Sequence, residues 1–413
     1  MTYREDAEIM ISTILRRIRR KLNRLRVHVN DENKHFEELL SVPPVPVKND
    51  NSYVIIVHGA QYGGAPLLGL DIAKEFCRQG RQVDILSLGY GPLIKDFAAV
   101  ANVQVCINEK EAEAYIERLY NIGFHRAICN GALTGKCVPL LKKKGYSITA
   151  LIHELPGVIQ YFDAEKDIKQ IINDSDSLIY PATFVKNQIE RKYGVNQNTL
   201  VLHQGLANIA KNTLTKTEAK RMIAEKYGFN CELPLFINVA TINERKGFDL
   251  FVEMAAIDHT AIYLWVGDGI DGRFGKKVTR KIGVTPDNLV LPGYINDMEL
   301  LNTIYRAADI LLLTSREEPF GTIVLEAFSR ETPVVAFRGC GGYEDVVIPS
   351  KTGFLVPPFD LPEMIKDSHA LVNNRDKLDK VRAECYTVAS KSDFSEYCRV
   401  IAQQSISCST YLE

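Results

Sequence analysis

Residues 310–330 read Ile-Leu-Leu-Leu-Thr-Ser-Arg-Glu-Glu-Pro-Phe-Gly-Thr-Ile-Val-Leu-Glu-Ala-Phe-Ser-Arg, and they carry the clearest structural signal in the chain. Ile310–Leu313 is a short apolar run typical of a buried strand. Thr314–Gly321 is a polar stretch with a proline and a glycine, which indicates a loop. A helix is predicted from Thr322 to Arg330. A strand, a loop and a helix in this order are typical of a parallel α/β sheet.

The same alternation extends along the chain in both directions. The other predicted strands are 53–57, 82–88, 127–129, 149–153, 178–180, 199–202, 235–239, 261–266, 289–291 and 333–336. Helical stretches separate most of them. This pattern predicts an α/β protein with two doubly wound, Rossmann-like domains facing a central cleft, together with a helical N-terminal extension.

The predicted limits follow these changes of pattern. They are an extension and linker at 1–47, domains at 48–205 and 206–385, and a C-terminal helix at 386–413, for which a return to the N-terminal domain stays open. In open parallel sheets, ligands bind outside the carboxyl ends of the strands. Each domain is therefore expected to hold one part of a two-part substrate.

Composition excludes several classes of protein. The 413 residues are 46% hydrophobic and 24% charged, which is typical of a globular protein. Because 50 Lys and Arg balance 51 Asp and Glu, no nucleic-acid partner is expected. The nine cysteines lack Cys-x-x-Cys spacing, which favours a reducing compartment. No apolar run reaches the roughly 18–20 residues that span a bilayer, so the expected location is the cytoplasm.

The N-terminal extension has its own pattern. Apolar residues recur at helical spacing from Ile11 to Leu25, and basic residues lie between them. Such a basic amphipathic helix suits peripheral contact of residues 9–27 with an anionic membrane, at the inner face of the cell membrane. It equally suits packing on the protein body or on a second copy, as in a homodimer. Both interpretations stay open.

Two carboxylates mark the stretch quoted first. Glu318 lies in the predicted loop and Glu326 in the predicted helix. A carboxylate accepts two hydrogen bonds in one plane, which suits the vicinal hydroxyls of a sugar. The helix start favours a bound anion, and Gly321 allows a ligand to approach the backbone. For Glu326 the simpler alternative is that it complements the helix dipole.

Glu-x-Phe-Gly-(x)4-Glu resembles the donor-sugar signature of the retaining family-four glycosyltransferases of the GT-B fold. Further segments resemble the family in the same order: 245–249, 265–269, 291–295, 331–336, 341–346, 352–360 and 394–395. The resemblance is strong over 235–400 and weak over 53–205. It implies a hexosyltransferase that uses a nucleotide-diphosphate sugar, with a glycan or lipid-linked acceptor, in polysaccharide or glycoconjugate synthesis. It implies neither a metal nor a cofactor.

The resemblance also implies roles for single residues. Glu326 would bind the nucleotide ribose, Glu318 the transferred sugar, and Lys246 the diphosphate. The rest of the implied donor site is the backbone of Phe320, Gly321, Thr322 and Ile323, the base-contacting Tyr294 and Ile295, and the Gly63-Gly64 loop near the phosphates and acceptor. His153 resembles a strand-end histidine that contacts the donor sugar near the reacting carbon. His203 is interpreted as a hinge or packing residue.

The chain departs from the family at one position. The family often has an arginine upstream of the lysine that also holds the diphosphate, whereas this chain has Thr241. Whether Arg245 replaces this arginine stays open. The glycine-rich loop at 58–65 lacks the Gly-x-Gly-x-x-Gly motif that would favour dinucleotide binding there. Asp174 and Asp176 suit a turn better than a metal site.

Three alternatives to a transferase remain. A nucleotide-sugar 2-epimerase shares the fold, but it needs acid–base carboxylates in both halves, and the N-terminal half shows no clear set. A non-catalytic glycosyltransferase-like partner would fit the loss of the arginine at Thr241. A sugar-binding regulatory module is the third. The presence of Lys246, Glu318 and Glu326 favours an enzyme.

Overall fold

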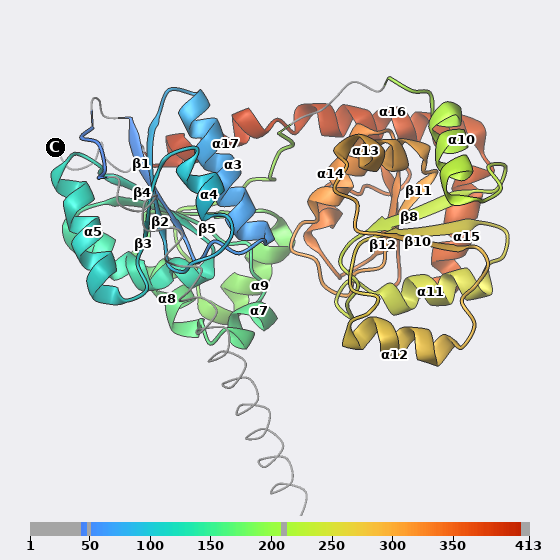
Figure 1. Ribbon diagram of the computed structural model, residues 1–413, viewed down its shortest axis with the longest axis horizontal. Coiled ribbons are helices and arrows are strands. Elements are labelled where there is room, and N and C mark those ends of the chain that lie inside the picture. Colours follow the sequence, from blue (N-terminus) through green and yellow to red (C-terminus); the bar gives the residue numbers. More distant parts are fainter. Residues whose placement is uncertain (1–42, 48–50, 208–212, 406–413) are drawn as a thin grey trace, which may run out of the picture. The chain divides into compact units, whose positions relative to one another are not determined.

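The computed structural model describes residues 43–47, 51–207 and 213–405 (Figure 1). The predicted helix and membrane contact at 9–27 lie outside these residues. The chain divides into two compact units. One contains the described residues up to Leu151, Phe162–Ser177, and Gln404 with Ser405; the other contains Ile152–Tyr161 and Leu178–Gln403.

The first sheet has seven strands in the order β3-β2-β1-β4-β5-β6-β7. Its strands are β1 (Ser52–Val57), β2 (Gln82–Ser87), β3 (Asn102–Val105), β4 (Arg126–Asn130), β5 (Ser147–Leu151), β6 (Ser177–Tyr180) and β7 (Thr199–Val201). The accompanying helices are α3 (Gly64–Arg78), α4 (Ile94–Ala98), α5 (Glu109–Asn121), η1 (Ala132–Cys137), α6 (Val138–Lys144), α7 (Pro156–Tyr161), α8 (Glu165–Asp174) and α9 (Thr183–Tyr193). β1 pairs in parallel with both β2 and β4, so the direction of winding reverses between β1 and β4.

The second sheet has six strands in the order β10-β9-β8-β11-β12-β13. They are β8 (Leu235–Val239), β9 (Ile262–Val266), β10 (Leu289–Gly293), β11 (Ile310–Leu313), β12 (Val334–Phe337) and β13 (Gly353–Val356). The helices are α10 (Lys216–Tyr227), α11 (Phe248–Ile257), α12 (Arg273–Ile282), α13 (Met298–Ala307), α14 (Thr322–Ser329), η2 (Gly342–Asp345), α15 (Leu361–Val372), α16 (Arg375–Lys391) and α17 (Phe394–Gln404). β8 pairs in parallel with both β9 and β11, so this winding reverses between β8 and β11.

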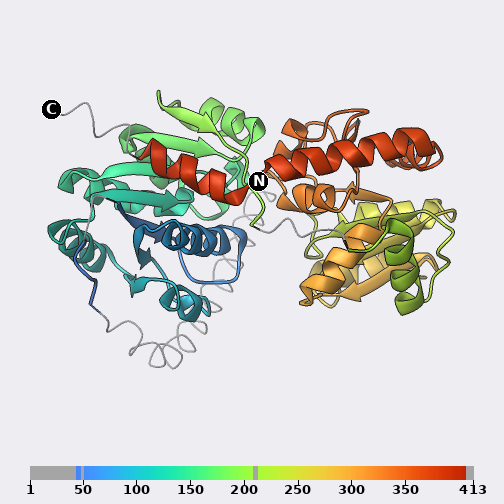
Figure 2. The ribbon, with the colours of Figure 1, turned by 90° about the horizontal axis from the view of Figure 1, so that it is seen from above.

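Helices cover both faces of the second sheet. α11 and α12 lie on one face, and α13 and α14 lie on the other (Figure 1). The long helix α16 packs along α14 (Figure 2). The central strands β9 and β11 are buried along their whole length, as expected for parallel strands with helices on both sides.

The predicted fold class is confirmed, since both sheets are parallel and doubly wound. β5 ends at Leu151, so His153 lies beyond the strand predicted over 149–153. The strands β3 and β13 were absent from the prediction. Both are edge strands with partly exposed residues. β3 alternates polar and apolar residues and so lacks the continuous apolar run that marks a central strand, whereas β13 has only three apolar residues after a glycine. The two sheets span 52–201 and 235–356, and the domain limits 48–205 and 206–385 stay predictions.

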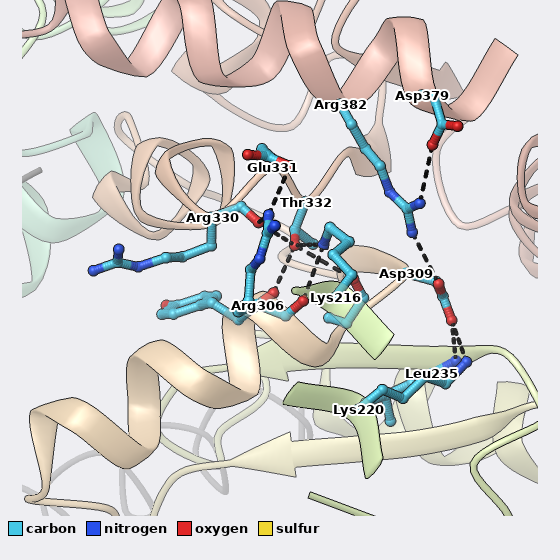
Figure 3. A network of polar contacts seen from close by, with 12 residues as sticks. Lys216, Lys220, Leu235, Arg306, Asp309, Arg330, Glu331, Thr332, Asp379 and Arg382 are labelled. Atoms are coloured by element: carbon cyan, nitrogen blue, oxygen red, sulfur yellow. Dashed lines mark hydrogen bonds and ion pairs between the residues drawn. The ribbon is translucent and has the colours of Figure 1, made fainter. Parts of the chain in front are cut away.

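A polar network joins elements at the amino edge of the second sheet (Figure 3). Asp309, just before β11, accepts hydrogen bonds from Lys220 Nζ at 2.7 Å and from Leu235 N at 2.9 Å. Its second oxygen accepts from Arg382 Nη2 at 3.1 Å. One buried carboxylate therefore connects α10, α16 and the start of β8.

Lys216, at the start of α10, makes a second connection in this network (Figure 3). Its Nζ donates to Arg306 O at 3.2 Å, Ala308 O at 2.9 Å and Thr332 Oγ1 at 2.8 Å. Burial, and then the charge of Arg382, lowers the pKa of Lys216 well below its ordinary value. The ammonium satisfies carbonyl groups at the C-terminal end of α13, where a cation also complements the helix dipole.

Replacing Lys216 with Met is expected to destabilise the second unit by about 2 kcal/mol, because it leaves two carbonyls and a hydroxyl without this donor. Trp265 is the single tryptophan of the sequence and lies in the core of this unit. Denaturant unfolding followed by its fluorescence measures the effect. Arg221→Met, at an exposed position on α10, is the control and should change the stability by under about 0.5 kcal/mol. Equal effects of the two variants would contradict the role of Lys216.

Candidate functional site

Two loops meet at the reversal of winding in the second sheet. One leaves β8 and carries Lys246, and the other leaves β11 and carries Glu318. The crevice outside the carboxyl ends of strands at such a reversal is where open α/β sheets bind ligands. The sequence-predicted residues Lys246 and Glu318 therefore lie where the topology favours a site.

Gly247 allows the two loops to approach each other. It precedes α11 with a φ of +71°, and a Cβ on it would lie 1.9 Å from Thr314 O. Thr314 Oγ1 donates to Lys246 O at 3.1 Å, and Lys246 N donates to Asn243 Oδ1 at 2.9 Å. The backbone on both sides of Lys246 is thus fixed against the end of β11.

Lys246 and Glu318 form an ion pair, in which Nζ contacts Oε2. Their side chains are 16% and 8% exposed, so the pair is largely shielded from water. Ser315 Oγ donates to the same carboxylate oxygen at 3.3 Å. The backbone of Glu318 is also fixed, because its N–H donates to Cys340 O at 2.9 Å and its carbonyl accepts from Gly342 N at 3.0 Å.

Arg245 adds a second cation beside this carboxylate. Its Nη1 lies 3.9 Å from Glu318 Oε2 and donates to Glu317 O at 2.9 Å. Arg245 O accepts from Arg316 N at 2.8 Å, which ties the two loops together again. The side chain of Arg245 is 42% exposed. Two cations therefore share one carboxylate, and the remaining positive charge favours an anionic ligand.

The start of α14 follows directly. Gly321 has a φ of +81°, a conformation that favours glycine, and a Cβ there would approach Glu318 Cγ to 3.1 Å. Thr322 and Ile323 are the first residues of the helix and are partly exposed, whereas Phe320 is buried. N–H groups in the first turn of a helix lack intrahelical acceptors, so they can donate to a bound anion.

Glu326 lies farther along α14 and has a partner that the sequence did not predict. Tyr305 Oη, from α13, donates to Glu326 Oε2 at 2.7 Å. Burial raises the pKa of Glu326, and the Tyr305 hydrogen bond opposes this rise. The two residues belong to different helices, so no spacing in the sequence could have indicated the contact.

Thr241 lies exposed on the loop after β8. The adjacent Ala240 O accepts a hydrogen bond from Trp265 Nε1 at 2.8 Å. A Cβ on Gly267, whose φ is +150°, would lie 1.9 Å from the same oxygen. The loop position is therefore set by β9 and the turn after it, and Thr241 adds a hydroxyl group but no charge.

Tyr294 and Ile295 follow the edge strand β10, which lies beyond β9 from β8. Tyr294 is 71% exposed, whereas Ile295 packs against the core of the second unit. Both lie at the carboxyl end of the sheet, and their contact with the base stays a prediction. Because β9 and β8 separate β10 from β11, Tyr294 and Ile295 lie at the end of this edge that is away from Glu318.

His203 packs on the site residue Phe320, with the rings stacked at 5.1 Å between centroids. Its Nε2 lies 3.1 Å from Asp345 Oδ2, which also accepts from Thr183 N at 2.7 Å. Burial alone would raise the pKa of Asp345, but the hydrogen bonds from His203 and Thr183 hold it below its ordinary value. His203 thus packs within the fold, one of the two roles interpreted from the sequence, although its partner Phe320 was not indicated there.

The glycine-rich loop lies in the first unit, at the end of β1. Gly63 caps α3 and Gly64 begins it. A Cβ on Gly64 would meet no atom within 4 Å, and one on Gly63 would meet only Pro66 Cδ, at 3.7 Å. The protein itself therefore leaves open space at both glycines, into which a ligand could approach the backbone.

Two histidines follow strands of the first sheet. Burial, and then the charge of Lys136, lowers the pKa of His58 at the end of β1. His153 lies beyond β5, is half-buried, and its N–H donates to Glu154 Oε2 at 3.2 Å. His153 belongs to the second unit with Ile152–Tyr161, whereas Gly63 and Gly64 belong to the first.

The described part of the chain lacks disulfides, metal clusters and membrane-spanning helices. The cysteines there are all free thiols. Residues 43–47, 51–207 and 213–405 contain no cluster of three or more His, Cys, Asp or Glu placed to hold a metal. No helix within these ranges has the length and apolar character to cross a membrane.

Comparison with known proteins places this geometry in context. The profile of the family described as "Glycosyl transferases group 1" matches residues 219–387. Processive diacylglycerol alpha-glucosyltransferase of Acholeplasma laidlawii is 26% identical over 41% of this chain and 50% of its own length. Glycogen synthase of Desulfitobacterium hafniense is 31% identical over 44% of this chain and 41% of its own length. The chain thus spans half or less of the length of these relatives.

Solved structures resemble almost the whole fold. Anabaena HepE, determined in complex with UDP, superposes with a TM-score of 0.73 at 17% identity, covering 87% of this chain and 100% of that one. Sucrose-phosphate synthase from Thermosynechococcus elongatus has a TM-score of 0.71 at 18% identity over the same shares. At these identities the likeness establishes the GT-B fold.

Proposed function

We propose that the chain is a retaining hexosyltransferase, and the match of residues 219–387 to the group 1 glycosyltransferase profile supports this proposal. It moves a hexose from a nucleotide-diphosphate sugar to a glycan or lipid-linked acceptor. The observation that carries the proposal is the ion pair of Lys246 and Glu318 at the reversal of the second sheet, next to the start of α14. A shielded cation beside free helix N–H groups suits a leaving diphosphate.

The donor is proposed to bind along the carboxyl edge of the second sheet. Glu326 accepts hydrogen bonds from the ribose hydroxyls, while Tyr305 holds one of its oxygens. The backbone at Tyr294 and Ile295 contacts the base. Lys246 binds the diphosphate, and Glu318 binds the hexose.

Charge at the diphosphate is the point where the chain differs from its family. Thr241 offers no cation, but Arg245 lies beside the same carboxylate as Lys246. We therefore assign the missing positive charge to Arg245. The exposed guanidinium can turn to a bound phosphate by giving up its 3.9 Å contact with Glu318 Oε2, while Lys246 stays paired with that carboxylate.

Transfer with retention needs no protein nucleophile in this proposal. The acceptor oxygen bonds to the anomeric carbon on the face from which the diphosphate oxygen departs, and the hydroxyl proton passes to the departing diphosphate. Lys246 and the N–H groups at Thr322 stabilise the charge that develops on the leaving group. His153, Gly63 and Gly64 are proposed to contact the sugar and phosphates from the first sheet.

A lipid-linked acceptor is one of the two acceptor classes. The basic pattern at 9–27 supports it, as does the diacylglycerol acceptor in the name of the Acholeplasma relative. Contact with a membrane is therefore proposed as peripheral. A polysaccharide acceptor fits the glycogen synthase relative equally.

The proposal is tested by adding UDP-, GDP- and dTDP-sugars to the purified chain. The matching donor should raise the melting temperature and be hydrolysed slowly without acceptor, with an α-configured donor releasing the α-anomer first by NMR. An epimerase would instead return an epimerised donor, and a non-catalytic partner would bind without turnover. Absence of binding to every nucleotide diphosphate at millimolar concentration would refute the transferase.

Tyr305→Phe is expected to weaken binding of the matching nucleotide about 5-fold, because Glu326 loses a hydrogen bond worth about 1 kcal/mol. The pKa of Glu326 should rise further, so binding should be lost at a higher pH as the solution is acidified. Titration calorimetry between pH 5 and pH 8 measures both effects. Tyr263→Phe is the matched control, since that buried hydroxyl donates to Asp258 instead. Equal behaviour of the two variants would contradict the ribose role of Glu326.

A further inference from the structure

A second hollow lies in the first unit, at the carboxyl ends of strands in its sheet. It has a volume of about 210 Å³ and is bordered by Leu88 after β2, Cys106 after β3 and Cys137 in η1. The helices α5 and α8 close its sides, and both are labelled in Figure 1. Drug-sized ligands occupy pockets of about 300–1,000 Å³, so this hollow suits a single ring.

The lining combines an apolar floor with polar groups of both signs. The floor includes Ala112 and Leu140, in addition to the two thiols. The polar groups are Asn108, Glu109, Lys136, Lys166, Asp167 and Gln170. Two lysines balance two carboxylates, so the lining has no net charge to favour an anion.

A sugar-like ring is the ligand that matches this mixture. Each hydroxyl group both donates and accepts hydrogen bonds, and the lining offers ammonium and amide donors together with carboxylate and amide acceptors. The carbon face of such a ring suits the apolar floor. A purely apolar ligand would leave the polar groups without partners, at a cost in free energy.

The helices around the pocket are held in place by close packing and by a helix cap. A Cβ on Gly135 would lie 2.1 Å from Asp167 O, so η1 is pressed directly against α8. Asn108 caps α5 by accepting a hydrogen bond from Glu111 N at 3.0 Å. Burial raises the pKa of the Cys106 thiol to about 12, so this thiol is neutral and belongs to the apolar floor.

Leu88 connects the pocket with the glycine-rich loop of the same unit. It lines the pocket, and a Cβ on the next residue, Gly89, would lie 3.6 Å from His58 O, at the end of β1. The loop that contains Gly63 and Gly64 begins directly after His58. The pocket is therefore close to the glycine-rich loop, which the family resemblance puts near the phosphates and the acceptor.

We propose that this pocket binds one polyol ring of the acceptor, held by hydrogen bonds from Lys136, Lys166 and Gln170 over the apolar floor. The ring is either a sugar of a glycan or the inositol of a lipid headgroup, since both present the same hydroxyl chemistry. Its assignment to the acceptor rests on the proposed transferase function, whereas binding of the ring does not.

The test uses the full chain and free rings: D-glucose, D-galactose, D-mannose, N-acetylglucosamine and myo-inositol. Saturation-transfer NMR should detect binding of at least one of them. Preferential binding of inositol would identify a lipid headgroup as the source of the ring, and preferential binding of a sugar would identify a glycan. Lys166→Ala should weaken that binding about 5- to 10-fold, because the ring loses a charge-assisted hydrogen bond. Lys169→Ala, an exposed lysine on the same helix that does not line the pocket, is the matched control.

A second variant fills the pocket. Ala112→Met adds a longer side chain to the floor and should abolish ring binding, with folding checked by circular dichroism. Donor hydrolysis without acceptor should continue in both variants, which separates this inference from the transferase itself. No binding of any ring to the parent chain, or equal binding by the Lys166→Ala and Lys169→Ala variants, would overturn the proposal.

Discussion

Replacing Lys246 with Met is expected to lower the rate of donor turnover about 10²- to 10³-fold, with a smaller effect on nucleotide affinity. The loss of one preorganised group that stabilises transition-state charge has about this effect. Negative charge on the diphosphate grows as the bond to the sugar breaks, so the ammonium acts mainly on the rate. Donor hydrolysis without acceptor, measured by release of the nucleoside diphosphate, is the readout.

The ion pair with Glu318 complicates a single variant. Without Lys246, Glu318 is left in a largely shielded place with only the more distant Arg245 as a cation. Removing one partner of a buried pair can cost about 3–5 kcal/mol, so the Lys246→Met variant could lose activity by partial unfolding. Its stability should therefore be measured by Trp265 fluorescence alongside its activity.

A double variant separates the two explanations. Lys246→Met combined with Glu318→Gln removes both charges and should regain most of the lost stability, while turnover stays low. Lys276→Met, at an exposed position on α12, is the control and should match the parent chain. Recovery of turnover in the double variant would mean that Lys246 serves only as a counter-ion, and the proposed diphosphate role would be wrong.

The sequence indicated which residues belong to the candidate site, but not the contacts that hold them together. Lys246 and Glu318 were assigned to one site because ordered motifs resembled a known family. The structure gives the physical reason: Gly247 has no Cβ, so the loop can pack directly on Thr314 O. A glycine followed by a helix is visible in the sequence, but the carbonyl it packs against is not.

Other contacts lacked any local signal. Tyr305 with Glu326, Trp265 with Ala240, and His203 with Phe320 each join residues from different elements. Helical or strand periodicity shows which face of an element is buried, but not which neighbour covers it. The order of strands decides that, and it is a property of the whole sheet.

Asp84 provides the second large expected effect, in the core of the first unit. It lies in β2 and is 1% exposed. Asn102 Nδ2 donates to its Oδ2 at 2.7 Å, and Tyr115 Oη donates to its Oδ1 at 2.9 Å. Burial raises the pKa of Asp84 from 3.8 to about 7, although these hydrogen bonds and the charge of Arg118 oppose the rise.

This shift predicts how stability depends on pH. Because the folded-state pKa of Asp84 lies above the unfolded value, its contribution is fully present below about pH 4 and is lost as the pH rises through 7. The whole effect is about 4 kcal/mol, of which roughly 2–3 kcal/mol is lost between pH 5 and pH 7. Hydrogen exchange of peptides from β1 and β2 measures it, with peptides from β8 and β9 as the internal reference.

Asp84→Asn should remove this pH dependence and make the first unit more stable than the parent above pH 7. The new amide can be accommodated, because Asn102 Oδ1 has no hydrogen-bond partner among the described residues and can accept from it after the Asn102 amide flips. Tyr115 can still donate to the oxygen of the new side chain. Asp96→Asn, at an exposed position on α4, should keep the slope of the parent. If Asp84→Asn also keeps that slope, the carboxylate is ionised in the fold at neutral pH, and the hydrogen bonds from Asn102 and Tyr115 outweigh the cost of its burial.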